Sequence, residues 1–215
     1  MSTLSDKIGD TYKVIRGYLP RETALQLAEE LKLQEEDWDK DKLATGDCLD
    51  FFNPPNMSAL SVEKIAYLNE FIGGPRLLPT YTYGREYKNG STLPIHVDKS
   101  QCEVSLSIHL NGDAPYAFHI YDLNGQVVSI DLEPGDAVLY DGMNAEHWRD
   151  SYEGESYVQT FHHYVFSPGE HEEEYKVNYG NLREYIKVYR GLIPADFCNE
   201  IITADYANRW EKAAT

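Results

Sequence analysis

The sequence predicts an α+β domain in which helices precede and support an antiparallel β core. Apolar residues recur with helical spacing up to about residue 72, and from Leu77 onward short segments alternate between apolar and polar residues. Turn residues separate these segments at regular intervals, which is typical of an antiparallel sandwich or barrel. The chain has 215 residues, 42% of them hydrophobic, which is enough for the core of one ordinary domain.

Two helices are expected before the strands. Pro20 opens the first one, which carries a single apolar stripe ending at Leu31. The second is expected over residues 58–72, because apolar residues there are spaced for one helical face and a Gly-Gly-Pro sequence follows.

Six strands are expected after the helices. Each is a short run rich in β-branched or aromatic residues, and most are bounded by a glycine-containing turn. The runs are LPTYTYGREY, CEVSLSIHL, AFHIYDL, VVSIDL, DAVLYDG and SYVQTFHHYVF. Helices first and strands afterwards place the helices outside the β core.

Charge and composition limit the partners. The formal net charge is −17, from 36 acidic and 19 basic residues, which argues against nucleic acid or an anionic membrane as the main partner. No apolar run approaches the length of a membrane span, and the first residues lack the apolar core of a signal peptide. The three cysteines form no CxxC pair, so we expect a cytoplasmic protein.

An internal repeat suggests how the chain is divided. The sequence KVIRGYLP at residues 13–20 returns as KVYRGLIP at residues 187–194, with five of eight residues identical, and a helix-like stretch follows each copy. We therefore expect one domain over residues 1–181 and the truncated start of a second copy over residues 182–215. The alternative is a C-terminal helix that shares only the pattern of its entry.

The sharpest chemical signal is His96-Val97-Asp98, followed 49 residues later by His147. Two imidazoles and one carboxylate can occupy one face of a metal ion and leave three positions open, an arrangement that suits Fe(II). Residues i and i+2 of a strand point to the same face, so His96 and Asp98 can share an ion. His147 must then come from another strand brought alongside.

The segment LPTYTYGREYKNGSTLPIHVDKSQCEVSLSIHLNGD resembles the metal-binding half of Fe(II)/2-oxoglutarate-dependent dioxygenases, especially those similar to prolyl 4-hydroxylases. The resemblance lies in an ordered set of motifs over about residues 77–165. A Tyr-bearing strand and a Gly turn precede His96, the next strand ends in Leu-Asn, and a Pro-Gly-Asp turn precedes the strand that leads to His147.

That resemblance implies a double-stranded β-helix, or jelly roll, with the metal between its sheets. It implies Fe(II) bound by His96, Asp98 and His147, 2-oxoglutarate as cosubstrate, and ascorbate as a further candidate cofactor. The activity implied is oxidative decarboxylation of 2-oxoglutarate coupled to hydroxylation of a small molecule or peptide, with a prolyl or another amino-acid residue as the candidate target. The rival hypotheses are a cupin-type metal enzyme and a non-enzymatic jelly-roll module, neither of which uses 2-oxoglutarate. The sequence does not indicate an oligomeric state.

The sequence departs from the family pattern at one position. Most members place an Arg or Lys about nine or ten residues after the distal His, where it binds the far carboxylate of 2-oxoglutarate. Here those positions hold Ser156 and Tyr157. Arg149 is the nearest substitute, because it lies two residues beyond His147 and on the same side of an extended chain. The alternative is a surface Arg that pairs with a neighbouring carboxylate.

Three further residues are expected to line the cosubstrate pocket. His109 precedes Leu-Asn, where some family members carry a Tyr that binds the same carboxylate, and Tyr87 resembles the Tyr that precedes the Gly turn. If Ser156 faces inward, His162 shares its row and becomes a pocket residue. For each of these, an ordinary core role is the alternative.

Overall fold

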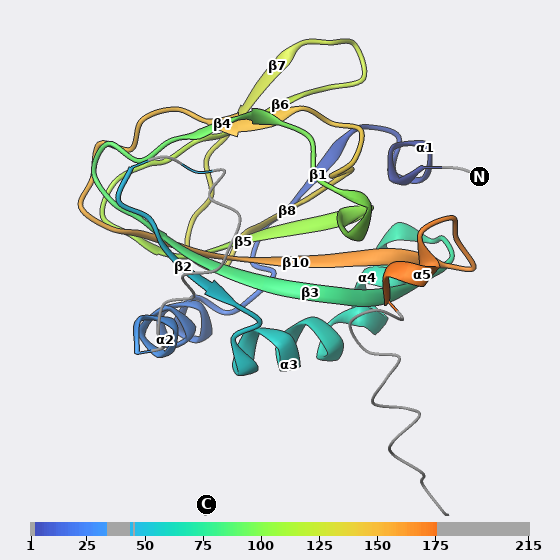
Figure 1. The fold of residues 1–215 in the computed structure, drawn as a ribbon, viewed down its shortest axis with the longest axis horizontal. Coiled ribbons are helices and arrows are strands. Elements are labelled where there is room, and N and C mark those ends of the chain that lie inside the picture. The colour runs from blue at the N-terminus through green and yellow to red at the C-terminus, as the bar shows by residue number, and fades with distance from the viewer. Residues whose placement is uncertain (1–2, 34–43, 45, 176–215) are drawn as a thin grey trace, which may run out of the picture. The chain divides into compact units, whose positions relative to one another are not determined.

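Two antiparallel β-sheets stacked face to face form the framework of the domain (Figure 1). The structure is a computed structural model that describes residues 3–33, 44 and 46–175. The larger sheet has the order β1-β8-β5-β10-β3-β2: Tyr12–Ile15, Ala137–Tyr140, Val104–Gly112, Tyr157–Ser167, Arg76–Tyr87 and Leu49–Phe52. The smaller sheet has the order β4-β9-β6-β7: Leu93–His96, His147–Arg149, Phe118–Tyr121 and Val127–Ile130. This arrangement confirms the expected jelly-roll core.

Helices cover the face of the larger sheet that points away from the smaller one (Figure 1). They are α2 (Arg21–Lys32), α3 (Pro55–Glu63) and α4 (Ile65–Ile72), while α1 (Leu4–Ile8), the 3₁₀ helix η1 (Ser100–Cys102) and α5 (Glu172–Tyr175) are short peripheral turns. Helix α2 packs closely on β3, because Gly84 has no side chain. A Cβ atom there would lie 2.7 Å from a methyl carbon of Leu31.

The structure corrects one expected helix. The predicted helix over residues 58–72 is two helices, α3 and α4, that meet at Lys64. The backbone of Lys64 has φ −83° and ψ −2°, which leaves the ideal helical range and lets the chain change direction. The Gly-Gly-Pro signal is confirmed as the end of α4, since Gly73 adopts a left-handed conformation with φ 64°.

The first copy of the sequence repeat has a definite structural role. Arg16 follows β1 and donates to the carboxylate of Asp136 at 2.6 Å, while the N–H of Gly17 donates to the same carboxylate at 2.8 Å. Gly17 has φ 62°, which favours glycine, and Pro20 precedes the first residue of α2. The second copy, and with it the proposed start of a second domain, lies outside the described residues.

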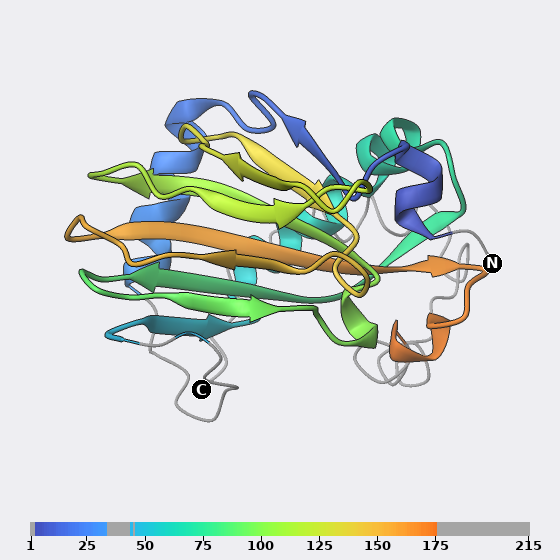
Figure 2. The same ribbon diagram turned by 90° about the horizontal axis from the view of Figure 1, so that it is seen from above.

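The central strands are buried on both faces, and their two rows of side chains differ in chemistry. On β5 the apolar row contacts the helices, whereas Ser105, Ser107 and His109 point toward the smaller sheet. On β10, which lies between β5 and β3 (Figure 2), Val158 belongs to the helix-side core and Gln159 to the opposite row. The space between the sheets is therefore unusually polar for a protein interior.

Neither described cysteine, Cys48 or Cys102, is in a disulfide. Within the described part of the chain, no helix combines the length and the apolar character needed to cross a membrane.

Candidate metal centre

His96 and His147 lie directly opposite each other on adjacent strands of the smaller sheet. They are register partners in the antiparallel pair of β4 and β9, and their ring centroids lie 4.3 Å apart. The Nδ1 atom of His96 lies 2.8 Å from the carbonyl oxygen of Pro94, and Nδ1 of His147 lies 2.8 Å from that of Ala145. Because a carbonyl only accepts, each Nδ1 carries the proton and each Nε2 keeps a free lone pair for a metal.

Asp98 completes the set from just beyond the end of β4. Its N–H donates to the carbonyl of Gly142 at 2.7 Å, which fixes the turn that follows the strand. Its Oδ1 atom lies 3.6 Å from Nε2 of His96 and 3.7 Å from Nε2 of His147. These distances are long for hydrogen bonds but suit three ligands around one ion with bonds of about 2.0–2.2 Å.

The protonation states of the triad suit a cation. Burial opposes ionisation of Asp98, but the neighbouring imidazoles of His96, His147 and His163 outweigh burial and lower its pKa to about 2. Burial lowers the pKa of His147 to about 4, against the opposing influence of Asp98. At neutral pH the centre therefore offers a carboxylate and a neutral imidazole, which are the forms that bind metal.

Arg149 lies on the same face of β9 as His147 and is almost completely buried, with 1% of its surface exposed. The rings of Tyr116, Phe118 and Tyr157 surround its guanidinium, whose central carbon lies 4.8, 5.5 and 5.1 Å from their centroids. The ring of Phe118 also lies 5.4 Å from that of His147. Arg149 is therefore an interior residue next to the candidate centre and not a surface Arg.

Arg149 donates only to neutral groups. One terminal nitrogen donates to the carbonyl of Tyr116 and the other to Oε1 of Gln159 at 2.7 Å, while Nε has no partner. Among the described residues, no carboxylate forms an ion pair with it; the nearby Asp150 pairs with His119. A buried cation without a counter-charge is costly, so this arrangement favours an anionic ligand.

Gln159 is a candidate site residue that the sequence alone did not reveal. It is fully buried on β10, twelve residues after His147, and directs its side chain to Arg149 from the strand where family members carry their basic residue. Its Oε1 accepts from Arg149 and its Nε2 has no partner. Nε2 is therefore a free donor beside the guanidinium.

The structure does not support the expected role of His109 as a donor to a carboxylate. The Nδ1 of His109 donates to the carbonyl of Leu132 at 2.7 Å, and burial lowers the pKa of the ring. Its Nε2 therefore presents a lone pair, which repels a carboxylate oxygen. The His109 ring instead stacks on Tyr157, with centroids 4.2 Å apart, and so supports one wall around Arg149.

His162 was expected in the row of side chains that faces the cosubstrate pocket, and the structure corrects this. The side chains of β10 that face the smaller sheet are the odd-numbered ones, as the contact of Gln159 with Arg149 shows. His162 lies in the other row with Tyr164, whose hydroxyl donates to the carbonyl of Ser61 in α3. His163 is the histidine that faces the site: its Nδ1 lies 3.0 Å from Oγ of Ser105, which contacts Asp98.

Tyr87 lies between the sheets, and its expected role in a cosubstrate pocket stays a prediction. It is fully buried, its hydroxyl has no partner, and its ring contacts that of Tyr116 edge to face at 5.2 Å. Arg85, which lies on β3 and is buried like Arg149, forms an ion pair with Asp50. Its charge is already balanced, so Arg149 remains the stronger candidate for an anionic ligand.

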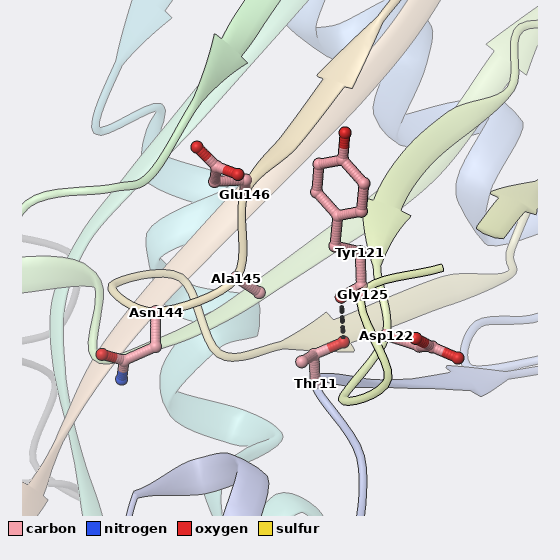
Figure 3. A pocket seen from close by; sticks show the side chains of 7 residues that line it. All are labelled: Thr11, Tyr121, Asp122, Gly125, Asn144, Ala145 and Glu146. Carbon is pink, nitrogen blue, oxygen red and sulfur yellow. Dashed lines mark hydrogen bonds between the residues drawn. The ribbon is translucent and has the colours of Figure 1, made fainter. Parts of the chain in front are cut away.

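A surface hollow of about 310 Å³ lies at the loop that leads into β9 (Figure 3). It is lined by Thr11, Tyr121, Asp122, Gly125, Asn144, Ala145 and Glu146, none of which is an expected site residue. The hydroxyl of Thr11 donates to the carbonyl of Tyr121, and the carboxylate of Asp122 accepts from N–H groups of its own turn. Because the polar groups of Thr11 and Asp122 are paired locally and none of His96, Asp98 and His147 lines the hollow, it is not the candidate site.

Comparison with known proteins agrees with the fold. No protein-family model and no curated protein sequence matches the chain. Solved structures do match, and they are Fe(II)/2-oxoglutarate-dependent oxygenases. A prolyl-4-hydroxylase of Pseudomonas putida has a TM-score of 0.59 and 13% identity, over 76% of this chain and 99% of that one.

Two more solved structures extend the comparison. HygX of Streptomyces hygroscopicus, with nickel and 2-oxoglutarate bound, has a TM-score of 0.60 and 13% identity over 76% of this chain and 85% of that one. A prolyl hydroxylase of Trichoplax adhaerens, in complex with a hypoxia inducible factor peptide fragment, has a TM-score of 0.59 and 15% identity over 81% and 90%. Identities this low show a shared fold, and they confirm the resemblance at that level.

Proposed function

We propose that this chain is a non-haem Fe(II)/2-oxoglutarate-dependent dioxygenase, in which His96, Asp98 and His147 hold the iron and Arg149 binds the far carboxylate of 2-oxoglutarate. One observation carries the proposal. A set of two imidazoles and one carboxylate converges next to a buried arginine that has no carboxylate partner among the described residues. The first group suits a divalent metal and the second an anion.

The residues present fit Fe(II). Each histidine keeps its Nε2 lone pair because its Nδ1 proton is bound to a backbone carbonyl. Three protein ligands on one side leave other positions for a cosubstrate and dioxygen. Cupin-type centres bring more histidines to the metal, and within the described residues no additional histidine joins this group.

The residues present also fit a dicarboxylate. His147 and Arg149 are two positions apart on one face of β9, so their Cα atoms lie about 6.6 Å apart along the strand. A five-carbon diacid that meets the metal at one end reaches the guanidinium with the other. The fork of Arg149 matches a carboxylate, and the free Nε2 of Gln159 and the unpartnered hydroxyl of Tyr87 supply neutral donors nearby.

The protein residues would then bind Fe(II) and 2-oxoglutarate, orient the cosubstrate and shield it from water. Fe(II) and 2-oxoglutarate, when bound, supply oxidative decarboxylation coupled to oxidation of a substrate C–H bond, with hydroxylation as the expected outcome. The rings of Tyr116, Phe118 and Tyr157 exclude water around Arg149 and so strengthen its pairing with a carboxylate. The substrate proposed is a small molecule or a peptide, with a prolyl residue as one candidate.

Anaerobic titration with 2-oxoglutarate tests the proposal. The Fe(II)-loaded protein should bind one equivalent and develop a weak visible absorption band, and the metal-free protein should bind far more weakly. Aerobic incubation of the loaded protein should then release succinate. A cupin-type enzyme or a non-enzymatic module would bind iron without showing any iron-dependent binding of 2-oxoglutarate, and that result would refute the proposal.

A further inference from the structure

A second polar cluster lies directly behind Asp98. It consists of Ser105 on β5, His163 on β10, Tyr81 on β3 and Cys102 at the end of η1. Ser105 is fully buried, and His163 and Cys102 are 5% and 1% exposed. None of these residues contacts Arg149, so the group is separate from the proposed cosubstrate pocket.

The hydrogen bonds of this cluster have a definite direction. Oγ of Ser105 lies 2.9 Å from Oδ2 of Asp98 and 3.0 Å from Nδ1 of His163. Oγ of Ser105 also lies 3.3 Å from the carbonyl oxygen of Cys102. Both the carboxylate and the carbonyl only accept, and the carboxylate is charged and closer, so the Ser105 hydroxyl donates its single proton to Asp98. Its oxygen then accepts from the Nδ1–H of His163. The chain of donors therefore runs from His163 through Ser105 to Asp98.

The donor at the start of this chain is held in place. The ring of His163 packs against that of Tyr81, with centroids 4.5 Å apart. The hydroxyl of Tyr81 in turn lies 3.1 Å from Sγ of Cys102. Tyr81 of β3, itself held by Cys102 of η1, therefore fixes the imidazole of His163 on β10. The imidazole in turn fixes the hydroxyl of Ser105.

We infer that Ser105 and His163 are positioning residues that orient the metal-binding carboxylate of Asp98, an inference that rests on the proposed metal centre. Ser105 occupies Oδ2, so only Oδ1 points at Nε2 of His96 and His147. A carboxylate held in this way binds an ion through one oxygen. Single-oxygen binding leaves three positions open, as a facial triad requires. Partners of metal ligands commonly change metal affinity about 10–100-fold.

The same cluster has the spacing of a second metal group, formed by Asp98, Cys102 and His163. The hydrogen bonds argue against this alternative. Oδ2 of Asp98 and Nδ1 of His163 are both engaged by Ser105, and burial raises the pKa of the Cys102 thiol, so that it stays protonated. We therefore expect one ion per chain.

Metal affinity measured without 2-oxoglutarate tests the inference. Mn(II) alone is titrated into the metal-free full chain under anaerobic conditions, and the free ion is counted by electron paramagnetic resonance. Ser105→Ala should weaken Mn(II) binding by about tenfold or more, and Ser105→Thr, which restores a hydroxyl, should recover most of it. Ser107→Ala is the matched control, because Ser107 is equally buried in the same row and its hydroxyl has no partner. It should change the affinity by less than about twofold.

A second variant tests the role of His163 directly. His163→Phe keeps a ring against Tyr81 but removes the Nδ1–H, so the loss should be about threefold, which corresponds to one neutral hydrogen bond. Unchanged affinity in Ser105→Ala, or equal losses in Ser105→Ala and Ser107→Ala, would overturn the inference, as would two ions per chain. A wild-type chain that binds no Mn(II) would instead contradict the metal centre itself.

Discussion

Replacing Arg149 by alanine should greatly weaken the binding of 2-oxoglutarate. Arg149 is 1% exposed, lies among three aromatic rings and has no carboxylate partner among the described residues. Truncating one member of a buried, hydrogen-bonded charge pair costs about 2–5 kcal/mol. Gln159 remains as a neutral donor, so we take the lower end of this range. About 2 kcal/mol corresponds to a Kd roughly thirtyfold higher.

The assay is isothermal titration of the Mn(II)-loaded protein with 2-oxoglutarate under anaerobic conditions. Arg149→Lys should recover only part of the affinity, because lysine keeps the charge but loses the two-pronged geometry. Arg76→Ala, which removes an exposed arginine at the start of β3, should bind like wild type. Mn(II) affinity should stay the same in every variant, since Arg149 hydrogen-bonds to Tyr116 and Gln159 and to none of the three proposed metal ligands.

Wild-type affinity in Arg149→Ala would refute this reasoning. The next candidate would be Arg85, whose ion pair with Asp50 would then have to open to admit the ligand. Equal weakening by Arg149→Ala and Arg76→Ala would also count against the assignment, because it would indicate a general effect of charge.

Three further predictions concern stability. Burial lowers the pKa of His162 to about 3 from 6.5, so the stability of the fold is complete above about pH 6.5 and falls as the pH drops toward 3. His162→Leu should reduce the slope of unfolding free energy between pH 6 and 4 by about 1.4 kcal/mol per unit; an unchanged slope would contradict this. Gly84→Ala should lower Tm by about 2–12 °C through overpacking against Leu31, and a Tm equal to wild type would show that α2 adjusts freely. Deleting residues 182–215 should shift Tm by less than about 2 °C, and a larger loss would assign that segment to the core of the described domain.

Much of the fold could be predicted from the alternation of apolar and polar residues along the sequence. The long strands β3, β5 and β10 have a clear period of two and strong turn signals at their ends. The short strands β4 and β9 could not be read in this way, because they have 4 and 3 residues and β4 contains Pro94. They form only because the smaller sheet brings His96 and His147 into register, which is a tertiary effect.

The sequence was enough to propose the three metal ligands, but it did not predict the side chains around them. His96, Asp98 and His147 share a distinctive spacing, and the structure brings them together. The sequence could not show which side chains of β10 point toward the smaller sheet, because both rows of its side chains are buried. Gln159 faces the smaller sheet and His162 faces the helices. Hydrophobicity distinguishes a buried row from an exposed one, but not two buried rows from each other.

The role of His109 was beyond the sequence for a different reason. The choice between donor and acceptor depends on which ring nitrogen is protonated, and that choice is made by a backbone carbonyl from a distant loop, at Leu132. No local pattern encodes such a contact.

A crystal structure of the anaerobic complex with Mn(II) and 2-oxoglutarate tests the central claim most directly. The account predicts one ion within about 2.0–2.2 Å of Nε2 of His96, Nε2 of His147 and Oδ1 of Asp98. It also predicts the far carboxylate of 2-oxoglutarate within hydrogen-bond distance of Arg149. An ion bound elsewhere, or a cosubstrate carboxylate that makes no contact with Arg149, would contradict it.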